Sequence, residues 1–364
     1  MSRLHLLYLD LVLRYSTRGK TDGVDLKTEE IGEMTVKTDS VWARTKKNSA
    51  ALLTAVRFPL YSFVFFPIFL GASVGAYASG GFNWSRFVLA ALIGFLAHSA
   101  VSLSNEVADE PIDYVNQNRT MFNGGTGLLV KNRISKYTLN AGWIASALLA
   151  LLVPAAMVFL FHYHWLLIGS LGLALFLGVE YSFPPLRLSR IGLGEAAAFI
   201  AYGVPFLTVG FVSQDAARAV IGHVFRDYKF YLLGLPVSSS IAVTLCLTQI
   251  PDTDADRSNG KRSISVLMGP KNVLLFAVFL LLVSAASFAG FVPLHILPLS
   301  FASIACILPV LTVLVIMTNL DAYKTPAGGK MINIMGLSFT SAVFSALVPT
   351  IYFLANMGKQ ALFR

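Results

Sequence analysis

Long apolar stretches follow one another along almost the whole chain, separated by short polar segments. An α-helix of about 20 apolar residues spans the hydrocarbon core of a bilayer, and it satisfies its own backbone hydrogen bonds there. Taking stretches of about 18 or more residues as spans, we predict about nine transmembrane helices, or eight if the spans that meet near Tyr163 or Gly290 are fused. The predicted spans are 51–79, 86–108, 137–160, 165–183, 194–213, 229–250, 271–290, 294–318 and 331–356.

The composition agrees with a membrane protein. Hydrophobic residues make up 55% of the chain and charged residues only 13%. Such a chain is too apolar for a soluble globular domain. We therefore predict an all-α, polytopic membrane helical bundle around a central cavity, formed by residues 49–364.

Residues 1–48 differ from the rest of the chain. Residues 17–48 are polar and charged without apolar periodicity, which predicts a flexible cytosolic tail. Residues 4–13 are apolar, but they contain Asp10 and are too short to span a bilayer. This segment is either an interfacial helix with Arg14 at its edge or a frayed leader of no functional weight.

Basic residues are unevenly distributed between the two ends of the predicted bundle. Lys and Arg collect in the cytoplasmic loops of membrane proteins. Most of the 28 Lys and Arg residues lie in the N-terminal segment or in loops that follow even-numbered spans. We therefore predict a cytoplasmic N-terminus in a multi-pass protein of the cell inner or plasma membrane. Because basic runs interleaved with aromatic residues are missing, we expect no nucleic-acid partner.

Two acidic segments end the second and sixth predicted spans, so the topology places both on the cytoplasmic side. The first runs over residues 105–113 and the second over residues 252–256. Polar residues recur in them at every fourth position, which places them on one helical face unless Pro111 moves Asp113 into the first turn of a loop. Ionisable residues are costly in a membrane protein and mark functional sites.

Carboxylates that meet at one membrane side repel one another, so the predicted cluster needs cations. Carboxylate and amide oxygens suit Mg²⁺, a hard ion that commonly bridges carboxylates to phosphates. We therefore predict a site for two Mg²⁺ ions at the cytoplasmic active site. The predicted metal ligands are Asn105, Asp109, Asp113, Asp252 and Asp256, and the four Asp residues are also predicted catalytic residues.

Basic residues and glycines follow each acidic segment and supply the complementary charge. A Gly-Gly-Thr-Gly sequence covers residues 124–127, and glycine-rich backbone with cationic side chains is typical of phosphate sites. These features predict a diphosphate ligand. The predicted diphosphate-binding residues are Asn105, Arg119, Lys131, Lys261 and Arg262.

Three motifs stand in a fixed order along the chain. They are Asn105-x-x-x-Asp109-x-x-x-Asp113, the segment 181–187 (Tyr-Ser-Phe-Pro-Pro-Leu-Arg) followed by Gly192-Leu193-Gly194-Glu195, and Asp252-x-x-x-Asp256 followed by Gly260-Lys261-Arg262. Together they resemble the signatures of the UbiA superfamily of intramembrane prenyltransferases over roughly residues 50–356. Glu106 stands where that family usually has Asp.

The resemblance implies an enzyme embedded in the lipid bilayer that joins a polyprenyl diphosphate to an aromatic acceptor. It implies a catalytic role for Tyr181 and a diphosphate-binding role for Arg187. The second motif is similar to the branch that prenylates 1,4-dihydroxy-2-naphthoate in menaquinone biosynthesis. This acceptor is therefore the expected one.

Other functions stay open within the family. Gln249 and Pro251 stand where that branch more often has Asn and Arg, which allows a 4-hydroxybenzoate-like, homogentisate-like or glycerol-lipid acceptor, or cyclisation of a prenyl chain. A non-catalytic prenyl-lipid binding scaffold is a further alternative, although the intact set of four carboxylates favours an enzyme. A transporter is disfavoured because the acids lie at span ends rather than near the bilayer midplane. Arg57, inside the first span, faces the cavity or extends to the membrane interface.

Overall fold

The computed structural model describes residues 48–214 and 228–358. The chain divides into two units, Met1–Ala50 and Ala51–Arg364, and the second unit contains every helix discussed below. In the described residues the elements are α- and 3-10 helices without a strand, which confirms the all-α class. The predicted tail and interfacial helix lie almost wholly outside the described residues.

Within the described residues, eight helical stretches are long and apolar enough to cross a membrane. They are η1 with α3 (Phe58–Ser79), α4 (Trp84–Ala108), α6 (Lys136–Phe161), α8 with α9 (Gly194–Gln214), α11 (Tyr228–Thr248), α14 (Pro270–Phe291), α15 (Leu299–Thr318) and α16 (Gly329–Ala355). The fourth predicted span corresponds to α7 (Leu166–Ser182), an apolar helix of 17 residues that is shorter than these eight. Each predicted span thus contains a helix.

The fifth predicted span differs from the expectation of one continuous helix. It consists of α8 (Gly194–Tyr202) and α9 (Val204–Gln214), which meet at Gly203. A Cβ atom at Gly203 would overlap the Ser238 hydroxyl of α11, so the glycine permits a close approach at the break.

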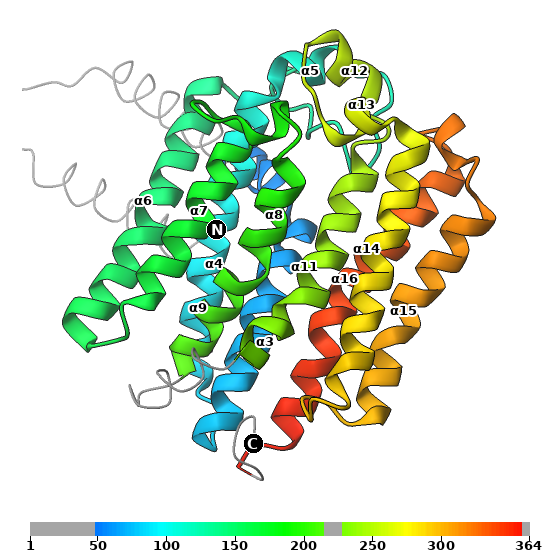
Figure 1. Cartoon of the computed structure of the whole chain (residues 1–364). Coiled ribbons are helices and arrows are strands. Elements are labelled where there is room, and N and C mark those ends of the chain that lie inside the picture. The colour runs from blue at the N-terminus through cyan, green and yellow to red at the C-terminus, as the bar shows by residue number, and fades with distance from the viewer. Residues whose placement is uncertain (1–47, 215–227, 359–364) are drawn as a thin grey trace, which may run out of the picture. The chain divides into compact units, whose positions relative to one another are not determined.

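The helices pack into one bundle within the second unit (Figure 1). Helix α3 packs against α4, α9 and α16, while α11 packs against α8, α14 and α16. Helices α3 and α9 cross closely because Gly71 lies against the Leu207 carbonyl and Gly210 against the Ile68 carbonyl, where any Cβ atom would overlap the facing backbone. These contacts leave a cavity between α3, α4, α7, α8 and α11.

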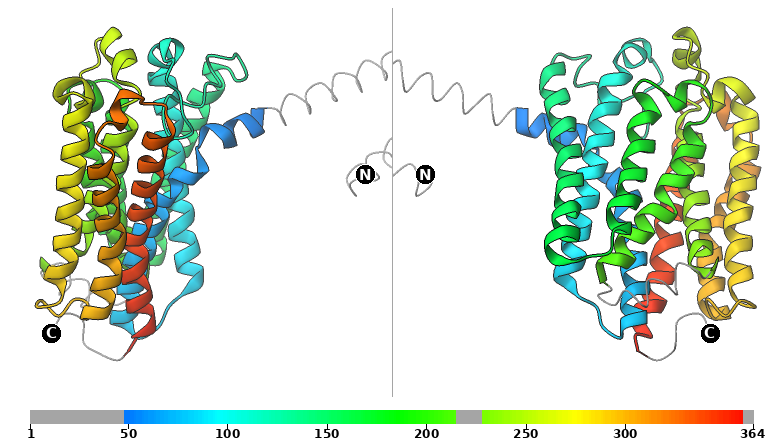
Figure 2. Two further views of the ribbon diagram at one scale, coloured as in Figure 1. Left: turned by 90° about the vertical axis from the view of Figure 1, so that its right-hand side faces the viewer. Right: turned by 60° about the vertical axis from the view of Figure 1, so that its left-hand side comes forward.

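Short helices gather at one end of this bundle. They are α5 (Glu110–Val115), which follows α4, and α12 (Thr253–Ser258) and α13 (Ile264–Met268), which follow α11. Helices α5 and α12 are in contact, although α6 to α11 lie between them in the chain. Figures 1 and 2 show all three at the same end, so both acidic segments emerge there, as the topology predicted.

Candidate active site

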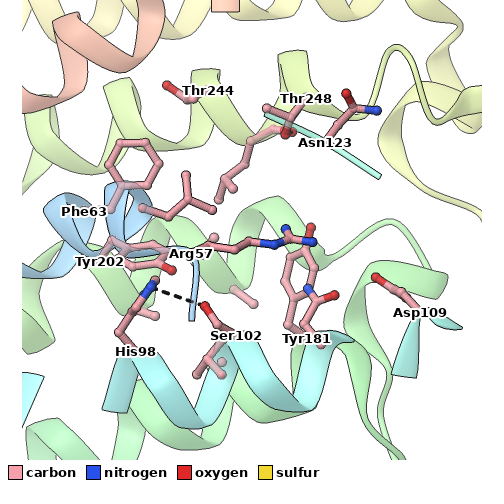
Figure 3. Close-up of a pocket in the computed structure, with 18 of the residues that line it drawn as sticks. Arg57, Phe63, His98, Ser102, Asp109, Asn123, Tyr181, Tyr202, Thr244 and Thr248 are labelled. Carbon is pink, nitrogen blue, oxygen red and sulfur yellow. Dashed lines mark hydrogen bonds between the residues drawn. The ribbon is translucent and has the colours of Figure 1, made fainter. Parts of the chain in front are cut away.

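One cavity contains side chains from both acidic segments. Its walls include the apolar and aromatic side chains of Phe63, Val64, Leu175 and Phe206. Figure 3 shows how polar residues from several helices surround the same space. All five predicted metal ligands line it, namely Asn105, Asp109, Asp113, Asp252 and Asp256.

The first acidic segment bends at Asp109. Helix α4 ends at Ala108 and α5 begins at Glu110, so Asp109 is the junction between them. The backbone N–H of Asp113 donates to the Asp109 carbonyl at 2.9 Å. Asp113 therefore lies in a separate short helix, so it neither continues α4 nor enters the loop that Pro111 had left open as the alternative.

The second acidic segment begins α12. Asp252 is the residue that precedes the helix, and Asp256 lies within it with only 1% of its surface exposed. The Asp256 N–H donates to the Asp252 carbonyl at 2.8 Å, so both side chains are carried by the same turn. Asp254, on the other side of this turn, is exposed and pairs with Arg257 at 3.5 Å.

Lys261 joins the two segments. Its Nζ lies 3.7 Å from Asp109 Oδ2 and 3.5 Å from Asp256 Oδ1, in a largely buried position. Burial alone would lower the pKa of this ammonium group, but the carboxylates of Asp109, Asp256 and Asp252 outweigh it and raise the pKa above its usual range. Lys261 therefore stays charged and holds the ends of α4 and α12 together.

Two amides fix the Asp252 carboxylate. Asn116 Nδ2 donates to Asp252 Oδ1 at 2.5 Å, and Asn123 Nδ2 donates to the same oxygen. Neither asparagine was among the predicted site residues. Their only signal was their position between the first acidic segment and the glycines.

The glycine-rich segment, residues 123–127, wraps closely around the first acidic segment. Gly124, Gly125 and Gly127 all have positive φ angles, a conformation that glycine adopts readily. A Cβ atom at Gly125 would overlap Asp113 Oδ2, and one at Gly127 would overlap the Arg119 guanidinium. Arg119 itself donates to the Asp113 carbonyl. The segment therefore packs its backbone directly against two predicted site residues.

Glu106 and Arg57 form an ion pair beside this segment. Arg57 Nη2 lies 3.4 Å from Glu106 Oε2, and Glu106 is buried. The Thr126 N–H and hydroxyl both donate to Glu106. Arg57 also lines the cavity, as does His98, whose Nε2 lies 2.8 Å from the Val56 carbonyl. Of the two positions expected for Arg57, the structure shows the one that faces the cavity.

Tyr181 belongs to a buried polar group on the cavity wall. Gln249 Nε2 donates to the Tyr181 hydroxyl at 3.3 Å and also to Glu195 Oε1. Within the described residues, Glu195 Oε2 and Gln249 Oε1 are buried without a hydrogen-bond partner. Buried polar atoms are rarely left unpaired, so this group has capacity for a further contact.

Four predicted diphosphate-binding residues do not line the cavity. Lys131, Arg187 and Arg262 are exposed, and Arg119 is half-buried and donates to the Asp113 carbonyl. The Arg262 backbone N–H donates to the Arg190 carbonyl at 3.0 Å. The diphosphate role of these four side chains stays a prediction.

The donor set is suited to a divalent cation that arrives with other ligands. Among residues 48–214 and 228–358, no three Asp, Glu, His or Cys side chains are grouped closely enough to make a metal centre alone. Both Asp256 carboxylate oxygens, however, are buried and accept no hydrogen bond in that part of the chain, although the Lys261 ammonium lies 3.5 Å from Oδ1. Mg²⁺ typically binds one or two carboxylates and completes its shell with waters and phosphate oxygens. The residues present therefore fit Mg²⁺ held jointly by protein and phosphate.

Burial and neighbouring carboxylates raise the pKa of two carboxyl groups in the cavity. Burial, with the Asp109 and Glu106 carboxylates, raises the pKa of Asp113 to about 7. Burial also raises the pKa of Asp252 to about 6, although the Asn123 amide acts in the opposite direction. A cation between such groups would relieve this unfavourable charge.

The chain is similar to known proteins over most of its length. The model of the UbiA prenyltransferase family matches residues 64–348. The 2-carboxy-1,4-naphthoquinone phytyltransferase of Synechocystis sp. is 26% identical over 223 residues, which cover 60% of this chain and 66% of that protein. The chloroplastic enzyme of the same name from Arabidopsis thaliana is 27% identical over 220 residues, which cover 59% of this chain and 54% of that protein.

The chain thus spans less than two thirds of the length of each of these relatives. Among solved structures, a UbiA homologue from Archaeoglobus fulgidus bound to DMAPP and Mg²⁺ matches with a TM-score of 0.55 and 15% identity, covering 80% of this chain and 98% of that one. This likeness shows the shared fold. Given the family match over most of the chain, the protein is a member of the UbiA prenyltransferase family.

Proposed function

We propose that this protein transfers a polyprenyl group from an allylic polyprenyl diphosphate to an aromatic acceptor. The observation that carries the proposal is the convergence of both acidic segments and Lys261 on a cavity whose remaining walls are largely apolar and aromatic. Such a cavity offers a charged end for a diphosphate and an apolar space for a prenyl chain.

Mg²⁺ is the proposed cofactor, and bound Mg²⁺ would neutralise charge on the diphosphate leaving group. Asn105, Asp109 and Asp113 on one side and Asp252 and Asp256 on the other are the residues that would hold it. Lys261 adds a fixed positive charge between the two sides. The solved relative from Archaeoglobus fulgidus binds both DMAPP and Mg²⁺, which supports this assignment.

The cavity walls would protect the reactive carbon. When the allylic C–O bond breaks, its electron pair leaves with the diphosphate, and positive charge develops on the prenyl carbon. Phe63, Tyr181, Tyr202 and Phe206 line the cavity and help to keep water away from that carbon. An electron-rich ring carbon then forms the new C–C bond, and it regains aromaticity by losing a proton or CO₂.

The proposed acceptor is a carboxylated naphthalene diol such as 1,4-dihydroxy-2-naphthoate. The names of the Synechocystis and Arabidopsis relatives, which refer to a 2-carboxy-1,4-naphthoquinone, support this choice. We further propose that the bundle lies in the cell inner or plasma membrane with the acidic end in the cytoplasm. The concentration of Lys and Arg in the loops at that end supports this orientation.

Prenyl transfer by the purified protein in lipid nanodiscs tests the proposal. Labelled prenyl diphosphate would be supplied with 1,4-dihydroxy-2-naphthoate, 4-hydroxybenzoate, homogentisate or a glycerol-type lipid, with Mg²⁺ or with EDTA. A prenylated naphthalene product that requires Mg²⁺ is the expected result. Product from a different acceptor would correct the acceptor alone. If no acceptor is prenylated and no cyclised prenyl product forms, the enzyme proposal is wrong and the lipid-binding scaffold takes its place.

A further inference from the structure

Two carboxylates of the first acidic segment are buried, Glu106 and Asp113. Asp113 lines the cavity, whereas Glu106 does not. Glu106 follows Asn105 on α4 and has only 2% of its surface exposed. A buried carboxylate is tolerated when a cation and hydrogen-bond donors surround it. Its partners therefore indicate what its charge does.

Those partners come from two distant parts of the chain. The Thr126 N–H lies 3.0 Å from Glu106 Oε2 and 3.2 Å from Oε1, and the Thr126 hydroxyl donates to Oε1. On the other side, Arg57 Nη2 lies 3.4 Å from Oε2. The charge of Glu106 thus ties the glycine-rich segment and the start of the first span to α4.

Thr126 is well placed to anchor the glycine-rich segment. It stands between Gly125 and Gly127, both with positive φ angles. Glycine gives the backbone of this stretch many accessible conformations when no contact restrains it. Residues 124–127 contain no other side chain larger than hydrogen. A segment of this composition needs an external contact to hold one conformation, and Glu106 supplies it.

Fixing this segment also fixes two acidic residues. Gly125 packs against the Asp113 carboxylate, and Asn123 donates to the Asp252 carboxylate of the second acidic segment. The segment therefore connects Glu106 to one carboxylate of each acidic segment. A change at Glu106 would be transmitted to both.

We propose that Glu106 is a positioning residue: through Thr126 it latches the glycine-rich segment so that Asp113 and Asp252 are held in place to bind the metal-diphosphate group. The inference rests on the proposed function for its kinetic consequences, but the latch itself is a property of the protein alone. It predicts an effect on the donor and the metal, and none on the aromatic acceptor.

The kinetic test compares Glu106→Gln, Glu106→Asp and Thr126→Val with the wild type in nanodiscs. Glu106→Gln is expected to raise the KM for prenyl diphosphate and the Mg²⁺ concentration for half-maximal rate by about 10-fold, with the acceptor KM changed by less than about 2-fold. Thr126→Val should raise the same two constants about 3-fold, because its N–H still donates. The effects of Glu106→Gln and Thr126→Val should combine to less than their product in the double variant, since both side chains belong to one contact. Glu106→Asp, which keeps the charge, should restore most of the loss.

Asp321→Asn is the matched control. Asp321 also pairs with one cation, Lys330 at 3.0 Å, but it is exposed and lies outside the cavity lining. Its substitution should leave all three constants unchanged. Equal shifts in donor, metal and acceptor constants for Glu106→Gln, or no shift at all, would overturn the proposal. A merely structural role would reduce the amount of folded protein without separating these constants.

Amide hydrogen exchange tests the latch without any turnover. Peptides covering residues 120–130 should exchange at least about 10-fold faster in Glu106→Gln than in the wild type, while peptides from α14 stay unchanged. If exchange in residues 120–130 is unaltered, the latch does not exist. If the wild type prenylates no acceptor but the exchange rate rises as expected, the proposed function fails and the latch stands.

Discussion

The acidity of Asp113 and Asp252 predicts how the stability of the metal-free protein depends on pH. Their folded pKa values of about 7 and about 6 lie above the value of about 3.9 expected for an unfolded chain. Between these limits the folded state binds more protons than the unfolded state, so its stability falls as pH rises. In EDTA, the melting temperature should therefore decrease from about pH 5 to about pH 8.

Mg²⁺ should counteract this loss. Metal binding requires deprotonated carboxylates, so added Mg²⁺ should raise the melting temperature more at about pH 8 than at about pH 5. Asp113→Asn should weaken the pH dependence in EDTA to the part that Asp252 contributes, and the exposed variant Asp321→Asn should retain it in full. A melting temperature that rises with pH in EDTA, with Mg²⁺ having the same effect at both pH values, would contradict the assignment.

Asp109 and Asp256 should be indispensable for catalysis. Each lies within 4 Å of Lys261, at 3.7 Å and 3.5 Å, so either alanine variant leaves that lysine one carboxylate partner and should still fold. Asp109→Ala and Asp256→Ala are each expected to lower the rate of prenyl transfer by at least about 100-fold. The readouts are product formation and the elution profile on size-exclusion chromatography.

The neighbouring Asp254 provides the control for these variants. It lies on the same short helix as Asp256, but its side chain is 84% exposed and pairs only at the surface with Arg257. Asp254→Ala should retain nearly full activity, because exposed ion pairs contribute about 1 kcal/mol or less. Substantial activity in Asp109→Ala or Asp256→Ala would remove these residues from the proposed site.

The residues of the acidic segments could be predicted because a carboxylate at the end of an apolar span is conspicuous in the sequence. Their hydrogen-bond partners could not. Asn116 and Asn123 are separated from Asp252 by 136 and 129 positions, and no local pattern specifies a contact over such a distance. For the same reason Lys261 could be predicted from the sequence only as a diphosphate ligand. The structure shows that its ammonium group also lies between Asp109, at the end of α4, and Asp256 of α12.

At the scale of elements, the glycine-rich segment is expected to tolerate no side chain at Gly125. Gly125→Ala would add both backbone strain at a positive φ angle and an overlap with the Asp113 carboxylate. Gly80→Ala is the matched control, because Gly80 also has a positive φ angle but would have nothing within 4 Å of its Cβ atom.

Gly125→Ala should therefore weaken prenyl diphosphate binding by about 10-fold or more, measured as KM for the donor. Gly80→Ala should cost only about 1 kcal/mol of stability and leave that KM unchanged. Similar donor KM values for the two variants would show that the packing of Gly125 against Asp113 has no role in donor binding.

The helices themselves were the most predictable elements, because long apolar runs allow few alternatives in lipid. The exceptions have identifiable causes. Gly203 divides the fifth predicted span into α8 and α9 where α11 approaches closely, and the sequence gives no sign of that neighbour. Pro111 lacks a backbone N–H and disturbs the helix, which accounts for the end of α4 near Asp109. The sequence left open whether Asp113 continued that helix or entered a loop, and the structure instead has the short helix α5.

At the scale of the whole molecule, the proposed orientation can be tested by labelling from one side of the membrane. Lys330 and Ser85 are both exposed. Lys330 lies at the start of α16 and Ser85 at the start of α4, and the proposed topology places these two helix starts on opposite sides of the membrane. In intact cells or right-side-out vesicles, a membrane-impermeant maleimide should label Ser85→Cys at once. It should label Lys330→Cys only after the membrane is permeabilised, and the reverse pattern would invert the proposed topology.

The hydrogen bonds from Asn116 and Asn123 to Asp252 join the first and second halves of the chain within the proposed active site. The two halves are therefore expected to diverge together in evolution, since a substitution in one half must be accommodated by the other. Chimaeras that combine the first half of this protein with the second half of a distant relative should be inactive more often than the divergence of either half alone would suggest. Inheritance of this site is inheritance of a matched pair.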